Sequence, residues 1–396
     1  MSPTTLRRLL IGAVVAVCVV IVFLAGTGTA PPPQSATTVP RTTVPWVDRT
    51  TPTDDGLEPS FLEGRVASLQ SWLVENRGLP FLRPLDVKVF DEHGRDALAQ
   101  ELQDGKDYEW PSYGLVAPLF GVEWGPDDWW GLWALSDSVV IPIEVGDTIT
   151  SENLVQSMLP SLTDQHYRHR ERMDALIRSG LIGDELDALR TLVVGDASFT
   201  ASGLAWELAT GSEWIPAAGG CLSPRTLGFN SNWGAGNSYV CGLYVEGGWD
   251  RVNEAYADPP QSTAEILGIQ CAVEDTPLTP IDWPVRFEAS RGPIWLNIML
   301  NQLGGDISGI SGWCADHQRV LGDGGLQFLV MEIWLGSSDD AVIVERETRE
   351  FFAAARQLVR GSRGVESLVV RDGSWVGIAS TISTIDLCSQ LPGWCP

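Results

Sequence analysis

Residues 154–167 read Leu-Val-Gln-Ser-Met-Leu-Pro-Ser-Leu-Thr-Asp-Gln-His-Tyr, which is the pattern of an amphipathic helix. Four apolar residues recur at the spacing of helical turns and predict a buried stripe: Val155, Met158, Leu159 and Leu162. Ser151 can cap this helix, with Glu152 in its first turn. Pro160 lies inside it, where a proline removes one backbone N–H and costs about 3 kcal/mol.

The stretch resembles the active-site helix of a zinc metallopeptidase family of actinobacterial envelope proteins. In that family the helix carries His-Glu-x-x-His and then Asp-Gln-His, and residues 164–166 match the second triplet. Aligned on the triplet, Gln156 and Pro160 take the places of the two zinc-binding histidines. Ser157 takes the place of the general-base glutamate, so the family motif is replaced here by Gln-Ser-Met-Leu-Pro over residues 156–160.

Further segments carry the resemblance in the same order along the chain. Val194 stands before Gly195-Asp196-Ala197, where the family has a glutamate that serves as the third zinc ligand. The other similar segments are Arg77–Val87, Trp130–Trp133, Gly247–Trp249 and Val252–Thr263. The resemblance covers roughly residues 60 to 270, and the last third of the chain matches poorly. It implies an α+β, zincin-like fold with a predominantly helical core, a small sheet and disulfide-stapled loop regions.

Zinc catalysis is not expected from this residue set. A catalytic zinc needs about three N, O or S ligands and one open position, with a carboxylate that deprotonates the bound water. Gln156 is a poor ligand, Ser157 is a negligible base near neutral pH, and neither Pro160 nor Val194 offers a donor atom. We therefore expect no cofactor and no peptidase activity.

The polar residues that remain in these segments define a candidate binding cleft: Gln156, Ser157, Asp164, His166 and Asp196. His166 and His169 stand one turn apart and are an alternative metal site, but a solvated or structural role is favoured for His166. Asp196 and Glu207 are eleven residues apart, which is about 16 Å on one helix and too far for a glycosidase carboxylate pair.

The N-terminus predicts a membrane anchor. Arg7 and Arg8 precede an apolar run over residues 9–26, which places residues 1–8 in the cytoplasm and the rest of the chain outside. A cleaved signal peptide is the alternative, although the prolines at 31–33 would follow the cut directly. Cys18 lies within the apolar run and is expected to be a small apolar residue there.

Residues 27–57 are rich in Thr and Pro and predict an extended, disordered stalk. Residues 58–396 form the expected extracytoplasmic domain, within which 219–396 is a candidate sub-lobe. The formal net charge of −25 disfavours nucleic acid and anionic lipid as partners.

Cysteine usage outside the apolar run predicts three disulfides, because an even number on the oxidising side of a membrane favours pairing. Short loops favour Cys221–Cys241 and Cys388–Cys395, which leaves Cys271 with Cys314. Six cysteines allow 15 pairings, so this connectivity is a hypothesis. A cysteine metal site would need a close Cys-x-x-Cys spacing that the chain lacks.

Periodicity and turn residues predict the remaining elements. Helices are expected over 61–76, 92–103 and 347–359, and also after Asp184, which can cap a helix with Leu186, Leu189 and Leu192 on its buried face. Strands are expected over 86–91 and 138–145, with a hairpin over 365–378 that turns at Asp372-Gly373. The Gly-, Asn- and Ser-rich stretch 219–248 predicts loops with short strands.

These observations favour a membrane-anchored, extracytoplasmic pseudo-metallopeptidase that binds or scaffolds an unidentified protein or envelope ligand. One alternative is a hydrolase that works without the usual zinc ligands, which perturbed carboxylates in the cleft would support. The other is a cell-wall carbohydrate-binding protein that uses exposed tryptophans near Trp129, Trp130 and Trp133, although core filling is the favoured role of these rings.

Overall fold

The computed structural model describes residues 59–90, 138–142, 150–179, 183–214, 221, 232–271, 276–301, 308–323, 326–358, 366–381, 386–391 and 393–395. All of them lie in the unit that runs from Thr50 to Pro396. The predicted membrane span, the stalk, the expected helix over 92–103 and the tryptophans at 124–133 lie outside the described residues. No helix among the described residues is long and apolar enough to cross a bilayer.

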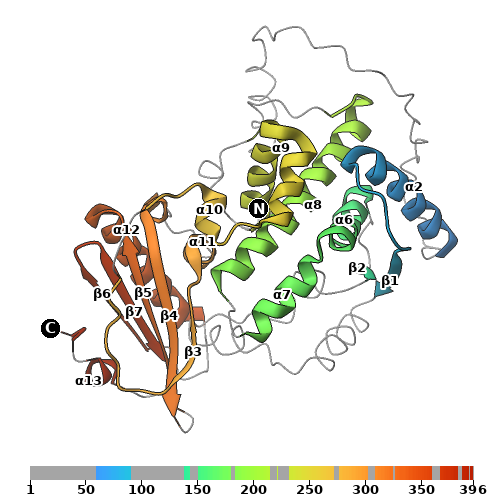
Figure 1. The fold of residues 1–396 in the computed structure, drawn as a ribbon. Helices are drawn as coiled ribbons and strands as arrows, with labels where there is room; N and C mark the ends of the chain where they lie inside the picture. Colours follow the sequence, from blue (N-terminus) through green and yellow to red (C-terminus); the bar gives the residue numbers. More distant parts are fainter. Residues whose placement is uncertain are drawn as a thin grey trace, which may run out of the picture. The chain divides into compact units, whose positions relative to one another are not determined.

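The first half of the described chain is mainly helical (Figure 1). Its helices are α2 (Pro59–Arg77), α6 (Ser151–Tyr167), α7 (His169–Arg178), α8 (Asp184–Thr210), α9 (Asn232–Ala257) and α10 (Thr263–Leu267). Two short parallel strands accompany them, β1 (Asp86–Phe90) and β2 (Ser138–Pro142). Helix α8 packs against both α6 and α9, so it is central to this helical region.

The second half contains a five-stranded antiparallel sheet in the order β3-β4-β5-β7-β6 (Figure 1). Its strands are β3 (Val285–Ala289), β4 (Trp313–Asp323), β5 (Leu326–Leu335), β6 (Glu366–Asp372) and β7 (Trp375–Thr381). The helices are α11 (Gly292–Asn301), the 3-10 turn η1 (Ser308–Gly312), α12 (Ser338–Leu358) and α13 (Leu387–Gln390). The structure is therefore a mixture of helices and an antiparallel sheet, which confirms the α+β class.

Strand β5 shows how the sheet is buried on both faces. Leu329, Met331 and Ile333 belong to the main core, which also contains the apolar face of α12. Phe328 and Val330 alternate with them and belong to a second cluster, formed with Leu387, Leu391 and Trp394 from the C-terminal segment. Because successive side chains of a strand point to opposite faces, a strand covered on both sides reads as the continuous apolar run seen here.

Two glycines bring α8 and α9 into backbone contact. A Cβ on Gly195 would lie 2.2 Å from the carbonyl carbon of Gly236, and a Cβ on Gly236 would lie 2.2 Å from the carbonyl oxygen of Thr191. Helix α9 also bends at Gly247-Gly248, where Gly248 has φ 66° and ψ −156°, a conformation that L side chains rarely adopt. The prediction of loops and short strands over 219–248 is therefore wrong from residue 232 onward, because these glycines serve helix packing and a kink.

Several predicted boundaries need correction. Thr150, rather than Ser151, is the N-cap of α6, and its hydroxyl accepts a hydrogen bond from Asn153 N at 3.2 Å. Gly183 precedes α8, so Asp184 is its first helical residue and its carboxylate points to another helix. Helix α12 begins at Ser338, nine residues before the predicted start. The hairpin of β6 and β7 is confirmed, and Gly373 has the positive φ of 58° that its tight turn requires.

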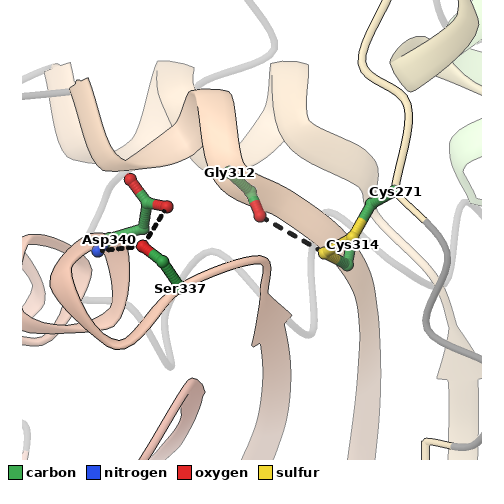
Figure 2. Close-up of a disulfide and its surroundings, with 5 residues drawn as sticks. All are labelled: Cys271, Gly312, Cys314, Ser337 and Asp340. Carbon is green, nitrogen blue, oxygen red and sulfur yellow. Dashed lines mark hydrogen bonds between the residues drawn. A yellow bond between two sulfur atoms is a disulfide. The ribbon is translucent and has the colours of Figure 1, made fainter.

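All three predicted disulfides are present: Cys221–Cys241, Cys271–Cys314 and Cys388–Cys395. The second joins the segment after α10 to the start of β4, beside the first turn of α12 (Figure 2). There Ser337 Oγ accepts from Asp340 N at 3.1 Å and donates to Asp340 Oδ2 at 2.6 Å, which caps α12. The bridge therefore fixes a point where three segments meet.

Candidate functional site

Of the three positions aligned with zinc ligands and the one aligned with the general base, Gln156, Ser157 and Pro160 lie on α6 and Val194 lies on α8, and these two helices pack against each other. Gln156 and Ser157 are half-buried, whereas Pro160 and Val194 are buried. Gln156 and Pro160 share a face of α6 because they are one helical turn apart. The four positions thus belong to one pair of contacting helices.

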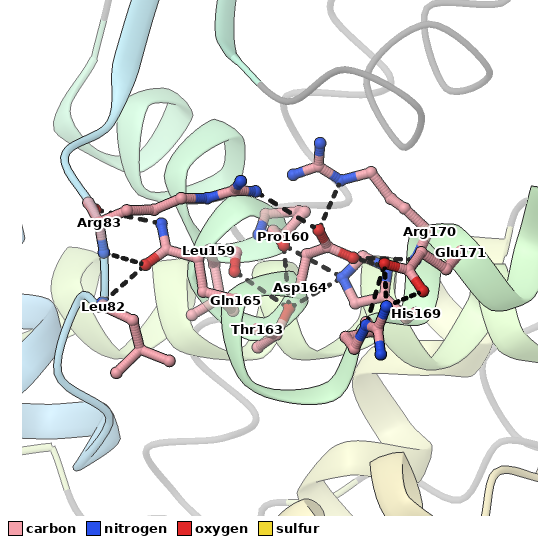
Figure 3. A network of polar contacts seen from close by, with 11 residues as sticks. Leu82, Arg83, Leu159, Pro160, Thr163, Asp164, Gln165, His169, Arg170 and Glu171 are labelled. Atoms are coloured by element: carbon pink, nitrogen blue, oxygen red, sulfur yellow. Dashed lines mark hydrogen bonds and ion pairs between the residues drawn. The ribbon is translucent and has the colours of Figure 1, made fainter.

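Pro160 remains inside α6, and its carbonyl is engaged by side chains (Figure 3). The carbonyl oxygen lies 3.0 Å from Nε2 of His169 and 3.2 Å from the hydroxyl of Thr163. The Thr163 hydroxyl also lies 3.1 Å from the carbonyl oxygen of Leu159 and 3.2 Å from His169 Nε2. Around the proline, the helix backbone is therefore supported by buried side-chain hydrogen bonds.

His169 is held in its neutral form. Burial lowers the pKa of its imidazole from the ordinary value to about 4, and the nearby Asp164 carboxylate opposes this shift only in part. A neutral ring that faces the Pro160 carbonyl must carry its proton on Nε2, so Nδ1 keeps a lone pair. Nδ1 lies 3.8 Å from Asp164 Oδ1, beyond hydrogen-bond distance. His169 is therefore a structural donor to α6.

Gln165 and His166 fasten the connection between α2 and β1 to the end of α6. Gln165 Oε1 accepts from Leu82 N at 2.7 Å and from Arg83 N at 3.0 Å (Figure 3). His166 Nε2 lies 2.7 Å from the carbonyl oxygen of Pro80, so it donates to that carbonyl. Two of the three side chains that match the Asp-Gln-His triplet thus hold a chain segment in place.

Asp164 stabilises the break between α6 and α7. Its Oδ1 accepts from Arg170 N at 2.9 Å, and its Oδ2 lies 3.4 Å from Arg170 Nε and 4.0 Å from Arg83 Nη2 (Figure 3). The break occurs at Arg168, the non-glycine residue with positive φ (53°) among those described. His166 and His169 therefore lie on different helices, and the idea that they share one helix face is wrong.

Asp196 lies at the centre of a second network, whose central ion pair is fully buried. Its Oδ2 lies 3.1 Å from Nη2 and 3.3 Å from Nε of Arg77, and neither side chain is exposed. Arg77 also donates from Nη1 to Asn253 Oδ1 at 2.8 Å, and its guanidinium lies 4.3 Å from the centre of the Trp249 ring. The Thr200 hydroxyl donates to Asp196 Oδ1 at 3.3 Å. The carboxylate is thus neutralised and hydrogen-bonded on both oxygens.

Tyr256 joins the two networks. Its hydroxyl donates to Asp196 Oδ2 at 3.1 Å, and the centre of its ring lies 6.1 Å from that of His169. Burial, with the charge of Asp196 next, raises the pKa of Tyr256 well above its ordinary value, so the phenol stays protonated. Its ring stacks on Tyr167 at a centroid distance of 4.9 Å. The α6 and α8 parts of the expected cleft are therefore connected through Tyr256.

Sequence reasoning missed the partners that make these networks, although signals for them existed. Arg77, Trp249 and Tyr256 all lie in segments that carry the family resemblance, but their pairing with Asp196 could not be read from spacing. Glu207 is on α8 as expected, and its carboxylate accepts from Trp72 Nε1 at 2.9 Å and from Trp214 N at 3.4 Å.

The described residues do not bring three or more His, Cys, Asp or Glu side chains together as a metal site. Neither Pro160 nor Val194 has a donor atom in its side chain, so zinc ligation at these positions does not fit the residues present. The chain matches no family model, no curated protein and no solved structure in comparisons with known proteins.

Proposed function

We propose that this chain is a membrane-anchored, extracytoplasmic pseudo-metallopeptidase that binds or scaffolds a component of the cell envelope without catalysis. The zincin-like fold and the family relationship are part of this proposal. Their main support is spatial: segments around residues 77, 164, 196, 249 and 256, which resemble the family in order along the sequence, meet through the Arg77–Asp196 ion pair, the Trp249 ring and the stacked rings of Tyr167 and Tyr256. Shared segments that pack together are expected when a chain keeps a scaffold.

The main support for the proposed loss of catalysis is the environment of Pro160. It occupies the place of the second zinc-binding histidine, and its carbonyl receives buried hydrogen bonds from His169 and Thr163. A working zinc helix would instead offer an imidazole there, with the lone pair of one ring nitrogen free for the metal. Here the nearby imidazole, that of His169, instead donates a hydrogen bond to the backbone of α6.

A binding role is the function that remains for such a scaffold. The membrane contact is assigned to the apolar run at the N-terminus, and the partner is an unidentified protein or envelope ligand. The net charge of −25 favours a neutral or basic partner over nucleic acid. A pseudo-enzyme of this kind would use the former substrate face for recognition, and Gln156 and Ser157 are only half-buried, so part of each side chain stays accessible to a partner.

The test is to rebuild the zinc site in the full-length chain with Gln156→His, Ser157→Glu, Pro160→His and Val194→Glu together. Three placed donors should bind zinc in the native state alone, which stabilises it by about 2.7 kcal/mol at a hundredfold excess over Kd. Thermal unfolding with and without zinc measures this, with Ser157→Glu alone as the control. The unmodified chain should carry no stoichiometric zinc after dialysis.

Two outcomes would overturn the proposal. A full equivalent of zinc in the unmodified chain would show that a metal site exists elsewhere. A folded quadruple variant without a zinc-dependent rise in Tm would show that the four positions do not converge, and the family relationship would have to be abandoned.

A further inference from the structure

A second group of buried ionisable residues lies where α8 begins, at the other end of the first half of this helix from Val194. Five side chains form it, and we call them the α8 entry cluster: Asp184, Asp187 and Arg190 on α8, Arg291 just before α11, and Asp316 on β4. Asp184, Asp187, Asp316 and Arg291 are each at most 7% exposed. The Arg190 side chain is 12% exposed. Such a concentration of charge away from water calls for explanation.

Asp184 connects α8 to the following helices through Thr263. Its Oδ1 accepts from Thr263 N at 2.9 Å and from the Thr263 hydroxyl at 2.5 Å. The same hydroxyl oxygen accepts from Ile294 N at 3.4 Å, so the chain of bonds continues into α11. The backbone N–H of Asp184 donates to the carbonyl of Ser290 at 2.9 Å. One carboxyl group therefore joins the first turns of α8, α10 and α11.

The space beside this carboxyl group is closed. A Cβ on Gly292 would lie 1.9 Å from Asp184 Oδ1, so the glycine backbone packs directly on the carboxyl group. Gly292 and Arg291 donate their backbone N–H groups to Asp316, each at 2.7 Å. The Ser290 hydroxyl lies 3.2 Å from Asp316 Oδ1. Asp316 thus fixes the start of α11 against the carboxyl group of Asp184.

The charges of the cluster do not balance. Three carboxylates face two guanidinium groups, so the fully ionised cluster holds one excess negative charge in a buried position. Asp187 forms an ion pair with Arg190 at 3.5 Å. The positive charge of Arg291 stabilises the ionised forms of both Asp187 and Asp316. Thr263, the contact from α10, is neutral, and residues 180–182 before α8 are Gly, Leu and Ile. One added proton would balance the cluster.

Burial raises the pKa of all three carboxyl groups, and the pKa of Asp184 reaches about 7. For Asp184 the hydrogen bonds from Thr263 lower the pKa, while the charges of Asp316 and Asp187 raise it further. The positive charge of Arg291 lowers the pKa of Asp187 and of Asp316, and Asp187 is also paired with Arg190, whereas Asp184 forms no ion pair with another described residue. Asp184 is therefore the group that takes the balancing proton.

We propose that Asp184 is a proton-operated latch that holds the start of α8 to α10 and α11 when its carboxyl group is protonated and loosens this joint when it ionises. Ionisation places an unpaired charge beside Asp316 and Asp187, and opening of the joint relieves that repulsion by admitting water. Helix α8 also contains Val194 and Asp196 of the candidate site. The latch therefore controls how firmly the first turn of this helix is held.

The test is hydrogen exchange of the full-length chain at pH 5 and pH 8, corrected for intrinsic exchange rates and read on peptides covering α10. Opening should become more than about tenfold easier at pH 8 in the wild-type chain, because the closed state then loses its bound proton. Asp184→Asn keeps the oxygen acceptor for Thr263 but cannot ionise, so its protection should be equal at the two pH values. Glu185→Gln, a half-buried neighbour, should behave like the wild type.

Wild-type protection that is equal at both pH values overturns the latch, and so does a loss of protection that persists in Asp184→Asn. If Asp184→Asn does not fold, the test compares the midpoint of the pH-dependent loss of protection in the wild-type chain with the midpoint in Thr263→Val. Loss of the Thr263 hydroxyl removes a bond that favours the ionised carboxylate, so the midpoint must move to higher pH. A midpoint that stays in place or moves down contradicts the proposal.

Discussion

Arg77 and Asp196 form an ion pair in which neither side chain is exposed, with Nη2 of Arg77 lying 3.1 Å from Oδ2 of Asp196. Asp196→Ala leaves the guanidinium buried without a carboxylate, so it should lower the free energy of unfolding by about 3–5 kcal/mol. Replacing both partners, Arg77→Met with Asp196→Leu, should cost less than the single change. Denaturant unfolding measures both. Glu171→Ala at the exposed Arg168–Glu171 pair is the control and should cost at most about 1 kcal/mol.

A single-change loss below about 1 kcal/mol would contradict the buried pair. It would also mean that the segments around residues 77 and 196 do not meet in the native state as the Arg77–Asp196 contact requires.

Gly236 and Gly242 lie on the same helix in opposite surroundings. A Cβ at 236 would overlap the carbonyl of Thr191, whereas a Cβ at 242 would meet nothing within 4 Å. Gly236→Ala should therefore destabilise the fold by about 1–3 kcal/mol or more, because α8 and α9 must separate. Gly242→Ala should stabilise it by about 0.5–1 kcal/mol through helix propensity. Thermal unfolding of the two variants compares them, and equal effects would rule out the close helix contact.

His169 makes stability fall in acid. Its folded pKa of about 4 lies below the ordinary value of 6.5, so the folded state binds fewer protons than the unfolded state and loses stability as the pH falls through this window. Asp184 acts with the opposite sign over an overlapping window, because its folded pKa is raised. The effect of His169 is therefore best measured in the Asp184→Asn background.

In that background His169 should account for a fall of about 2 kcal/mol in the free energy of unfolding between pH 6.5 and pH 4.5. This is the difference between the chains with and without His169, because the raised pKa values of Asp187 and Asp316 act with the opposite sign in both. Adding His169→Gln, which can still donate to the Pro160 carbonyl, should flatten the pH profile. Chemical denaturation at a series of pH values measures the difference. An unchanged slope would mean that His169 is not the neutral, buried donor described above.

The disulfide framework predicts a simple labelling result for the full-length chain. Of its seven cysteines, six are bridged, so denaturing alkylation without reductant should label Cys18 alone. The control Cys18→Ser should take no label. Each bridge should contribute about 2–4 kcal/mol, so reduction should lower Tm. Two or more further labelled cysteines would contradict the framework.

The elements that the sequence predicts well are those with strong local signals. Helix α2 follows from apolar residues at helical spacing and ends at Arg77, one residue before Gly78, which has φ 73°. The hairpin of β6 and β7 follows from a turn that contains Gly373. Two of the disulfides, Cys221–Cys241 and Cys388–Cys395, follow from short loops, and the third pair is the one that remains. Apart from this third pair, the structure is in each case determined by residues that are close to one another in the sequence.

The sequence does not predict helix α9, because glycine is common in loops but also allows close packing and kinks in helices. A Gly-rich stretch usually indicates a loop, but in α9 Gly236 permits contact with α8 and Gly247-Gly248 permits a kink. Which role a glycine has depends on its contacts with residues far away in the chain, and these contacts cannot be predicted from the neighbouring sequence. The candidate site shows the same limit: the alignment identified Asp196, but not its partners Arg77 and Tyr256, which are 119 and 60 residues away in the chain.

The strand order β3-β4-β5-β7-β6 has a consequence for how the chain folds. Strand β5 can pair with β4 as soon as both have been made, but its other edge must wait for β7, which follows α12 and β6. Until then a ten-residue, largely apolar strand has an unpaired edge, the feature that most invites intermolecular pairing. The period before β7 arrives is therefore when a chaperone would be most useful, and slowing β7, for example through a weaker turn at Gly373, should increase aggregation before it lowers equilibrium stability.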